Sequence, residues 1–577
     1  MLALADYAKW LRGAAGLDEP LLDLVRTWDR AGLVRRVWER DSSLWTGADE
    51  HRWLGWLSVN TLADPVDKLM GLARDVRHLG LTNVVLLGIG GSSLGAEALS
   101  QVLRGRDDSP ALHVIDTTDP AQISRMGSRI DLDQTLFIVS SKSGTTLEST
   151  LLADYFLELV RSRLGPREAG TRFLAITDPG SALEQLARSQ GFSQVWHGKP
   201  SVGGRFSALS NFGLVPAAAC GVDVASLLGR AAVMVASCGW EVSAGLNPGV
   251  QLGLTLGLAA SQGRDKVTLV LSPAIAALGP WLEQLLAEST GKRGRGLIPV
   301  VDEEVGEPSA YGHDRLFVYL RLEAGVDPVQ DEALRRLADV GCPVITLGMS
   351  DQLDIGAEFF RWQFATAVCG AVLEVNPFDQ PDVEASKVAT RALMTTHAPA
   401  VGLRTDRPLA LLGEIALFAD PVNTGFLRSV SGEQAGVEDL LSAHLARLGG
   451  GDYFAVLAYI DRSPTHFALL QQLRQMVRDT CRVATAVGFG PRYLHSTGQL
   501  FKGGPATGLF LQITCDDGVD LELPSRGYSF GTVKAAQALA DGRVLAERNR
   551  RLLTVHLGSD VVGGLTRLEH LVRGALR

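Results

Sequence analysis

Short apolar runs alternate with longer amphipathic segments over most of the chain. The apolar runs, which have the length and composition of strands buried on both faces of a sheet, begin with 84–87, 111–116, 135–141 and 172–178. Periodic segments such as 94–103 and 145–164 lie between them and have the spacing of helices. Strands that alternate with helices predict a parallel sheet flanked by helices, so we expect an α/β fold.

The alternation divides the chain into three units behind an amphipathic, helical N-terminal segment. We expect 1–75 to form this segment, 76–240 the first unit, 241–396 the second, and 397–577 a linker and the third unit. The third unit repeats the second unit's order of strand, helix, glycine-rich loop, strand and helix, which predicts a diverged copy.

Composition places the chain among ordinary multidomain globular proteins. It has 577 residues, of which 46% are hydrophobic and 21% charged, with a formal net charge of -9. A mildly acidic chain is a poor candidate for binding nucleic acid or an anionic membrane, so we expect neither partner.

The cysteines and the N-terminus indicate the compartment. Six scattered cysteines without a Cys-x-x-Cys pair predict buried free thiols in a reducing cytosol rather than a zinc site or a disulfide framework. The opening residues lack a basic stretch followed by an apolar one, so we expect no signal peptide and a cytoplasmic protein.

The first candidate for chemistry is the segment IVSSKSGTTLEST, Ile138–Thr150, where a strand-like run is followed by a cluster of hydroxyl groups. A turn that leads into a helix presents unpaired backbone N–H groups and the positive end of the helix dipole. Hydroxyls, free N–H groups and the ammonium of Lys142 together suit a phosphate. The simpler interpretation is a helix cap, but a cap needs only one hydroxyl.

The segment GIGGSSLG, Gly88–Gly95, is a companion turn after the preceding strand. Its spacing fits neither the dinucleotide motif Gly-x-Gly-x-x-Gly nor a P-loop. Ligands of such sheets lie at the carboxyl ends of the strands, and two anion-binding turns at one edge are more specific than either alone.

These two motifs resemble those of the sugar isomerase (SIS) domain and of the glucose-6-phosphate isomerase family. Three further segments are similar to that family's signatures in the family's order: VGGRFSALSNFG, AESTGKRGRGLIP and NPFDQPDVEASK. The segments SLWTG and GPRYLHSTGQLFKGGP look like the isomerase half of bifunctional transaldolase/phosphoglucose isomerase proteins. The resemblance covers residues 80–395 best and implies conversion of an aldose phosphate into a ketose phosphate without metal or organic cofactor. Because the third unit is interpreted as a diverged copy of the second, we expect three SIS-like units.

The resemblance also implies roles for single residues. Glu288 matches the base that moves a proton between C2 and C1 through a cis-enediol, and Arg205 matches the cation that stabilises the enediolate. Lys387 matches a lysine at the ring-oxygen end. The substrate contacts implied are Gly91, Ser92, Ser141, Lys142, Ser143, Thr145, Thr146, Gly204, Gln284 and Gln380. Outside their motifs, Glu288, Arg205 and Lys387 are more simply interpreted as surface residues.

The histidine that opens the sugar ring is where the chain departs from the family pattern. In many members it lies between the base and the lysine and comes from the neighbouring subunit. Here that interval holds only His313, whose neighbouring residues differ from the family's, while the better match, His495, lies in the third unit. If the third unit packs against the second as a partner subunit would, His495 reaches the active site from the same chain. Otherwise His495 is a structural histidine, and His313 is the reserve candidate for the ring-opening residue.

Three alternatives remain open from the sequence. A phosphosugar-binding regulator would keep the hydroxyl cluster but needs no base. An isomerase of broader range would also accept mannose 6-phosphate. The third unit could serve only as a lid or dimer wedge. The partner expected in every case is a small sugar phosphate, and the protein is expected to be a homodimer or a monomer with an in-chain pseudo-dimer.

Overall fold

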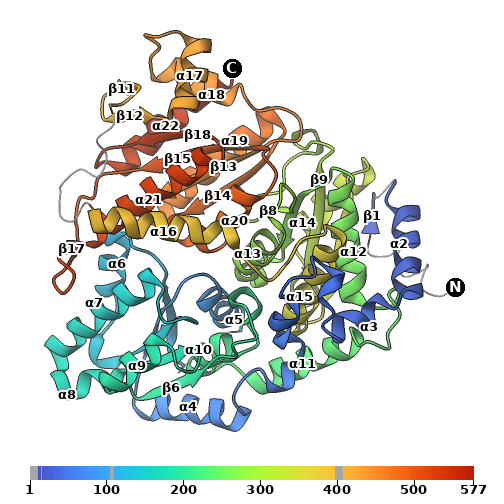
Figure 1. Ribbon diagram of the computed structural model, residues 1–577, viewed down its shortest axis with the longest axis vertical. Coiled ribbons are helices and arrows are strands. Elements are labelled where there is room, and N and C mark those ends of the chain that lie inside the picture. Colours follow the sequence, from blue (N-terminus) through green and yellow to red (C-terminus); the bar gives the residue numbers. More distant parts are fainter. Residues whose placement is uncertain (1–10, 14–15, 104, 106–108, 397–406) are drawn as a thin grey trace.

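The protein is built on parallel β-sheets with helices packed against them (Figure 1). The structure, a computed structural model, describes residues 11–13, 16–103, 105, 109–396 and 407–577. Within these residues the strands form three larger sheets and one small hairpin. The prediction of an α/β fold with flanking helices is therefore confirmed. None of the described helices combines the length and the apolar character needed to cross a bilayer.

The first sheet has the strand order β3-β2-β4-β5-β6, and all its neighbouring strands are parallel. Its strands are β2 (Asn83–Leu87), β3 (Ala111–Ile115), β4 (Thr135–Ser140), β5 (Phe173–Thr177) and β6 (Gln194–His197). The helices of this part are α5 (Leu94–Val102), α6 (Pro120–Gly127), α7 (Leu147–Leu164), α8 (Pro166–Ala169), α9 (Ala182–Ser189) and α10 (Asn211–Ala219). Strand β4 is buried along its whole length, as its continuous apolar run requires.

The second sheet has the order β1-β10-β9-β7-β8. Its strands are β7 (Lys266–Leu271), β8 (Ile298–Val300), β9 (Arg315–Leu322), β10 (Val344–Met349) and β1 (Leu11–Arg12). The helices are α11 (Val224–Ser237), α12 (Pro248–Ser261), α13 (Gly279–Thr290), α14 (Pro328–Asp339) and α15 (Ile355–Val372). The N-terminal segment, predicted to be helical, contains α2 (Asp18–Arg30), α3 (Leu33–Trp38) and α4 (Val66–His78). It also adds β1, which pairs antiparallel with β10 because the edge of β10 is otherwise unpaired.

The third sheet has the order β11-β12-β18-β15-β13-β14. Its strands are β11 (Ala410–Leu412), β12 (Ile415–Phe418), β13 (Tyr453–Tyr459), β14 (Ala484–Phe489), β15 (Gly508–Thr514) and β18 (Arg551–His556). The helices are α17 (Pro421–Ser431), α18 (Val437–Leu445), α19 (Pro464–Cys481), α20 (Gly498–Gly503), α21 (Phe530–Glu547) and α22 (Val561–Ala575). The hairpin consists of β16 (Glu522–Leu523) and β17 (Tyr528–Ser529). The predicted linker contributes β11, β12, α17 and α18, while its residues 397–406 lie outside the described residues.

The parallel strands of the second and third sheets are arranged in the same way. Counted along the chain, β7 to β10 take the spatial order fourth, third, first, second, and the strands β13, β14, β15 and β18 take the same order. The first four strands of the first sheet follow this order too, with β6 added beyond β5. This shared order supports the interpretation of the third unit as a diverged copy.

The hydrophobic cores show that the units are closely joined. One core cluster contains residues of the N-terminal segment and of both the first and second units, from Leu11 to Phe378. Helix α11, which the predicted boundary at residue 240 assigns to the first unit, packs against α15 of the second. A separate cluster joins Ala287, Ile298 and Val300 of the second unit to aromatic side chains of the third unit, including Phe501. The domain bounds remain a prediction.

Helix α16 (Pro381–Thr396) lies beside the third unit. The predicted bounds assign it to the second unit, and it packs against α20 and α21 of the third. Its Leu393 forms a small buried cluster with Ala536 and Ala540 of α21. Figure 1 shows this yellow helix lying along the orange and red part of the molecule. The apolar face of α16 finds its partner there, and this carries Lys387 to the junction of the units.

The cysteines are free, as predicted, but they are not all buried. Cys220, Cys238 and Cys369 are buried, whereas the remaining three are half-buried. Burial raises the pKa of the Cys220 and Cys238 thiols to about 12, which keeps these thiols protonated and unreactive.

Candidate active site

A cavity of about 760 Å³ lies where the three units meet, and we call it the central cavity. Its walls come from the turn after β2, the turn after β4, helix α13, helix α16 and the 3₁₀ turn Arg492–His495. Among the predicted site residues, those that line it are Gly91, Ser92, Lys142, Ser143, Thr145, Thr146, Gly204, Arg205, Gln284, Glu288, Gln380, Lys387 and His495. Ser141 and His313 do not line it.

The hydroxyl-rich turn connects the end of β4 to the start of α7. The Ser143 and Thr145 hydroxyls lie 2.9 Å apart, and the Thr145 amide donates to the Ser143 hydroxyl over 3.3 Å. Gly144 has φ 70°, and a Cβ there would lie 2.4 Å from the Leu183 nitrogen, so only glycine fits the turn.

The simple helix-cap interpretation does not hold for this turn. Thr146 occupies the N-cap position of α7, yet its side chain makes no capping hydrogen bond. Its hydroxyl instead accepts from the Ser141 hydroxyl over 3.0 Å. The first turn of α7 therefore begins without a side-chain cap, which suits the binding of an anion.

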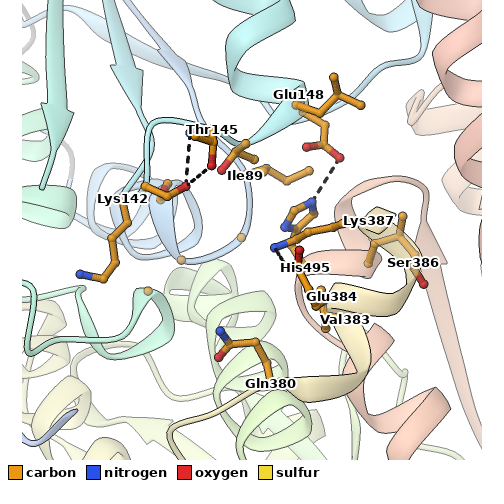
Figure 2. Close-up of a pocket in the computed structure, with 18 of the residues that line it drawn as sticks. Ile89, Lys142, Thr145, Glu148, Gln380, Val383, Glu384, Ser386, Lys387 and His495 are labelled. Carbon is orange, nitrogen blue, oxygen red and sulfur yellow. Dashed lines mark hydrogen bonds and ion pairs between the residues drawn. The ribbon is translucent and has the colours of Figure 1, made fainter. Parts of the chain in front are cut away.

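Two residues predicted as phosphate contacts are engaged elsewhere. The Ser141 hydroxyl accepts from the Gly144 amide at 3.1 Å and is buried within the turn. The Lys142 ammonium is bound to the Asp178 carboxylate and to the Lys199 and Pro200 carbonyls. Figure 2 shows Lys142 extending away from Thr145 and His495. Both residues shape the turn rather than face the cavity centre.

The glycine-rich turn after β2 is a site of close backbone approach. A Cβ on Gly91 would lie 2.1 Å from the Gly204 carbonyl carbon, so these two segments touch through their backbones. A Cβ on Gly90, whose φ is 60°, would lie 2.8 Å from the His495 Cβ. Glycine at these positions lets Arg205 and His495, from different units, approach the same turn.

Glu288 projects from the last turn of α13 and is held on both carboxylate oxygens. The Arg205 guanidinium lies 3.1 Å from Glu288 Oε1, and the Gln284 amide donates to Glu288 Oε2 over 3.1 Å. Gln284 and Glu288 are four residues apart and so share one face of the helix. With 8% of its surface exposed, Glu288 is fixed in orientation at the cavity wall.

Arg205 is almost completely buried, with 2% of its surface exposed. Its guanidinium donates to the Ser289 hydroxyl (2.7 Å), the Gln380 side-chain oxygen (3.0 Å) and the carbonyls of Pro377 (2.7 Å) and Asp379 (2.9 Å). Burial lowers the pKa of Arg205, and the nearby carboxylates oppose that shift. Arginine remains charged after such a shift, so the cavity contains a rigid, buried positive charge.

The Gln284 side chain has a hydrogen-bond acceptor without a partner among the described residues. Its amide nitrogen donates to Glu288 and to the His495 carbonyl (2.7 Å), which ties α13 to the third unit. Its side-chain oxygen is buried and has no hydrogen-bond partner among the described residues. An unpaired buried acceptor in a cavity wall is suited to a hydroxyl donor of a ligand.

His495 reaches the cavity from the third unit of the same chain. Its Nε2 lies 3.2 Å from the Glu148 carboxylate, whereas its Nδ1 has no hydrogen-bond partner among the described residues. Burial by itself would raise the pKa of Glu148, but the charge and hydrogen bond of His495 outweigh it and lower that pKa. Glu148 is thus a carboxylate that orients the imidazole, as Figure 2 shows.

Sequence reasoning missed Glu148. It lies on the second residue of α7, where an acidic residue is usually explained by the helix dipole alone. In the structure the Gln537 amide also donates to it over 2.6 Å, and the Thr118 hydroxyl donates to Gln537 over 2.6 Å. The signal that could have identified it is its position in the same motif as the hydroxyl cluster.

Lys387 lines the cavity from α16 and remains partly exposed. Its ammonium lies 3.6 Å from the Glu384 carboxylate, and 42% of its side-chain surface is accessible. Figure 2 shows Lys387 and His495 pointing into the same part of the cavity. His313, the reserve candidate for the histidine, is exposed and lies outside the cavity. Among the described residues no three histidine, cysteine, aspartate or glutamate side chains converge as metal ligands.

Several known proteins are similar to this chain over more than half of its length. The phosphoglucose isomerase family model matches residues 73–307, a range that contains Arg205 and Glu288 but neither Lys387 nor His495. The glucose-6-phosphate isomerase of Rubrobacter xylanophilus is 32% identical over 390 residues, which cover 59% of this chain and 89% of that protein. A probable glucose-6-phosphate isomerase of Methanococcus maripaludis is 29% identical over 383 residues, covering 59% and 84%.

Among solved structures, a hypothetical protein from Thermus thermophilus is similar with a TM-score of 0.56 and 25% identity. The similarity covers 66% of this chain and 98% of that one. Relatives of this identity and coverage, together with the family-model match, lead to one conclusion. The chain belongs to the glucose-6-phosphate isomerase family.

Proposed function

We propose that the protein is a glucose-6-phosphate isomerase, which interconverts glucose 6-phosphate and fructose 6-phosphate by proton transfer through a cis-enediol. The observation that carries the proposal is that Glu288, Arg205, Lys387, His495 and the hydroxyl-rich turn line one cavity. A regulator that only binds a phosphosugar has no use for a buried carboxylate fixed beside a buried guanidinium.

The phosphate is proposed to bind at the turn before α7 and at Ser92 of the neighbouring turn. The Ser143 and Thr145 hydroxyls and the uncapped first turn of α7 provide donors, and the helix dipole favours the negative charge. Lys142 is bound to Asp178 and supports the turn through this ion pair. The phosphate thereby fixes one end of the sugar.

Replacing Thr145 with valine is expected to raise KM for glucose 6-phosphate by about tenfold or more, the cost of losing a hydrogen bond to a charged group. The change in kcat should be small because Thr145 is remote from the reacting carbons in this arrangement. Steady-state kinetics check the result. Thr145→Ser, which keeps the hydroxyl, is the matched control and should retain a KM near that of the unmodified protein.

The proton transfer is assigned to Glu288. A carboxylate held by Arg205 and Gln284 has one fixed direction, so it can remove the C2 proton of the open-chain aldose and return it to C1. Negative charge then develops on the enediolate oxygens. The Arg205 guanidinium and the Gln380 amide lie where they can stabilise that charge without reorganising.

Ring opening is assigned to His495 with Lys387. The Glu148 carboxylate holds Nε2 of the imidazole and leaves Nδ1 free to exchange a proton with the sugar. The Lys387 ammonium faces the same part of the cavity and is proposed to lie at the ring oxygen. Both groups belong to the chain that also carries Glu288, so a monomer would contain every group of the proposed site. The free cysteines agree with a reducing, cytoplasmic setting.

The function is tested by incubating the purified protein with glucose 6-phosphate in deuterated water and following the products by NMR. We expect fructose 6-phosphate to form and deuterium to enter at the exchanging carbon, because the transferred proton passes through a solvent-exchangeable carboxyl group. Binding of the sugar phosphate without any turnover would instead favour the regulator. Parallel incubation with mannose 6-phosphate determines whether the epimer is also accepted.

A further inference from the structure

A second cavity, of about 930 Å³, lies on the other side of the segment that begins α16, and we call it the rear cavity. Its walls come from the N-terminal segment near Asp49, the loop after α13, the start of α16 and the ends of α20 and α21. Successive residues of one segment face the two cavities in turn. Gln380, Val383 and Glu384 line the central cavity, whereas Asp379, Pro381 and Asp382 line the rear one.

The rear cavity is lined by five cationic side chains: Lys292, Arg293, Lys502, Arg548 and Arg550. Three of them are buried, because Lys292, Lys502 and Arg550 expose only 4%, 2% and 7% of their surface. Buried charges are costly unless each of them is paired, so their partners decide what else the cavity can hold.

Carboxylates satisfy only part of this positive charge. Lys292 lies 2.7 Å from Asp379, and Lys502 lies 2.6 Å from Asp541. Arg548 lies 2.5 Å from Asp382. Among the described residues, no carboxylate forms an ion pair with Arg293 or Arg550.

Arg550 is incompletely hydrogen-bonded as well. Its Nη2 donates to the carbonyls of Lys502 (2.5 Å) and Gly504 (2.9 Å), while its buried Nε has no hydrogen-bond partner among the described residues. Burial lowers the pKa of Arg550 and the adjacent Arg548 adds to that shift, while Tyr453 and the Asp382 carboxylate oppose it. Burial likewise lowers the pKa of Lys292 to about 7, with a further contribution from Arg205.

Two further carboxylates line the rear cavity but do not pair with its cations. Asp49 accepts from the Trp53 indole at 2.9 Å and from the Asn376 amide at 3.4 Å. Glu547 is exposed to solvent. Among the described residues, Arg550 is therefore the buried cation of this cavity that has neither an ion pair nor a partner for its Nε, and a negatively charged ligand would relieve its desolvation.

We propose that the rear cavity is a binding site for a small polyanion that carries two or more phosphate or carboxylate groups. Guanidinium and ammonium groups bind both kinds of oxyanion, and the volume is that of a small-metabolite site. Arg293 and Arg550 are its principal contacts, with Lys292 between them and the central cavity. Arg293 is held in the left-handed backbone region at φ 55°, although glycine is favoured there.

Occupancy of this site is coupled to the central cavity through Lys292, and this part rests on the proposed function. From the side of the rear cavity, the Lys292 ammonium binds the Asn376 carbonyl and the Asp379 carboxylate. From the side of the central cavity, Arg205 donates to the Pro377 and Asp379 carbonyls of the same loop. An anion in the rear cavity competes with Asp379 for the ammonium, which loosens the loop that fixes Arg205. Bound polyanion therefore lowers turnover.

Isothermal titration calorimetry tests the binding with two probes, inorganic pyrophosphate and citrate. We expect at least one probe to bind. The probe that binds more tightly indicates whether the ligand is a phosphate or a carboxylate compound. Arg293→Ala should weaken that binding about tenfold. Arg295→Ala is the matched control: this neighbouring arginine is exposed, pairs with Glu374 at 2.9 Å and lines neither cavity. Arg293→Lys, which retains the charge, should keep most of the affinity.

The same titration with Thr145→Val distinguishes the two cavities, because this substitution weakens the binding of a phosphate in the central cavity only. Binding that Thr145→Val abolishes and Arg293→Ala leaves intact would place the anion in the central cavity and overturn the proposal, as would the failure of both probes to bind. In kinetic assays we expect pyrophosphate to lower kcat with little change in KM. Purely competitive inhibition would overturn the coupling. If the protein has no isomerase activity, the proposed function fails, while calorimetry still decides the rear cavity.

Discussion

Replacing Glu288 with glutamine is expected to lower kcat by about 10²–10⁴-fold, the range that a positioned general base contributes. The amide preserves the shape of the side chain but cannot accept the C2 proton. KM should change little, because the phosphate contacts on the other side of the cavity remain. Initial rates in both directions, with a circular dichroism spectrum to verify the fold, measure the effect.

Glu283→Gln is the matched control for this experiment. Glu283 lies five residues earlier on the same helix, does not line the central cavity, and is half-buried. Burial, together with the Asp302 charge, raises the pKa of Glu283 to about 8, so it is mostly protonated near neutral pH and glutamine resembles it closely. We expect nearly unchanged rates. Equal losses in both variants would mean that α13 was merely disturbed and would remove Glu288 as the base.

Replacing His495 with asparagine is expected to lower kcat with the cyclic substrate by about 10²–10⁴-fold, because proton exchange with the ring oxygen is lost. The Gln284 bond to the His495 carbonyl involves the backbone and should persist. His313→Asn is the control, since this exposed histidine lies outside the cavity. Loss of activity in the His313 variant alone would reverse the assignment.

Mixing the two inactive variants tests whether the site is completed within one chain. We expect no recovery when Glu288→Gln and His495→Asn chains are unfolded together, refolded and assayed, because every cavity then contains one defect. If the histidine came from a partner subunit, half of the dimers would be mixed and each would hold one intact site. About a quarter of the original activity would then return, as the statistics of a symmetric dimer require.

Local sequence patterns predicted many of the elements that build the site. Helix α5 (Leu94–Val102) and strand β4 (Thr135–Ser140) occur where the sequence predicts them, at 94–103 and 135–141. The hydroxyl turn lies between β4 and α7 as expected, because a buried apolar run followed by small polar residues and an amphipathic segment leaves few alternatives. The short strand β14 was missed because an apolar run of this length, with glycine near its end, gives a weak signal.

The sequence by itself determined the family, the α/β fold, the glycine-rich and hydroxyl-rich turns and the motifs that carry Glu288 and Arg205, because each depends on residues within a few positions of one another. Only the tertiary structure decided that Glu148 orients His495, 347 positions away along the chain, and that Lys142 turns to Asp178. The tertiary structure also placed α16, and with it Lys387, against the third unit, and it formed the rear cavity. Burial against distant segments determines these pairings, and no local pattern records which buried surfaces will meet.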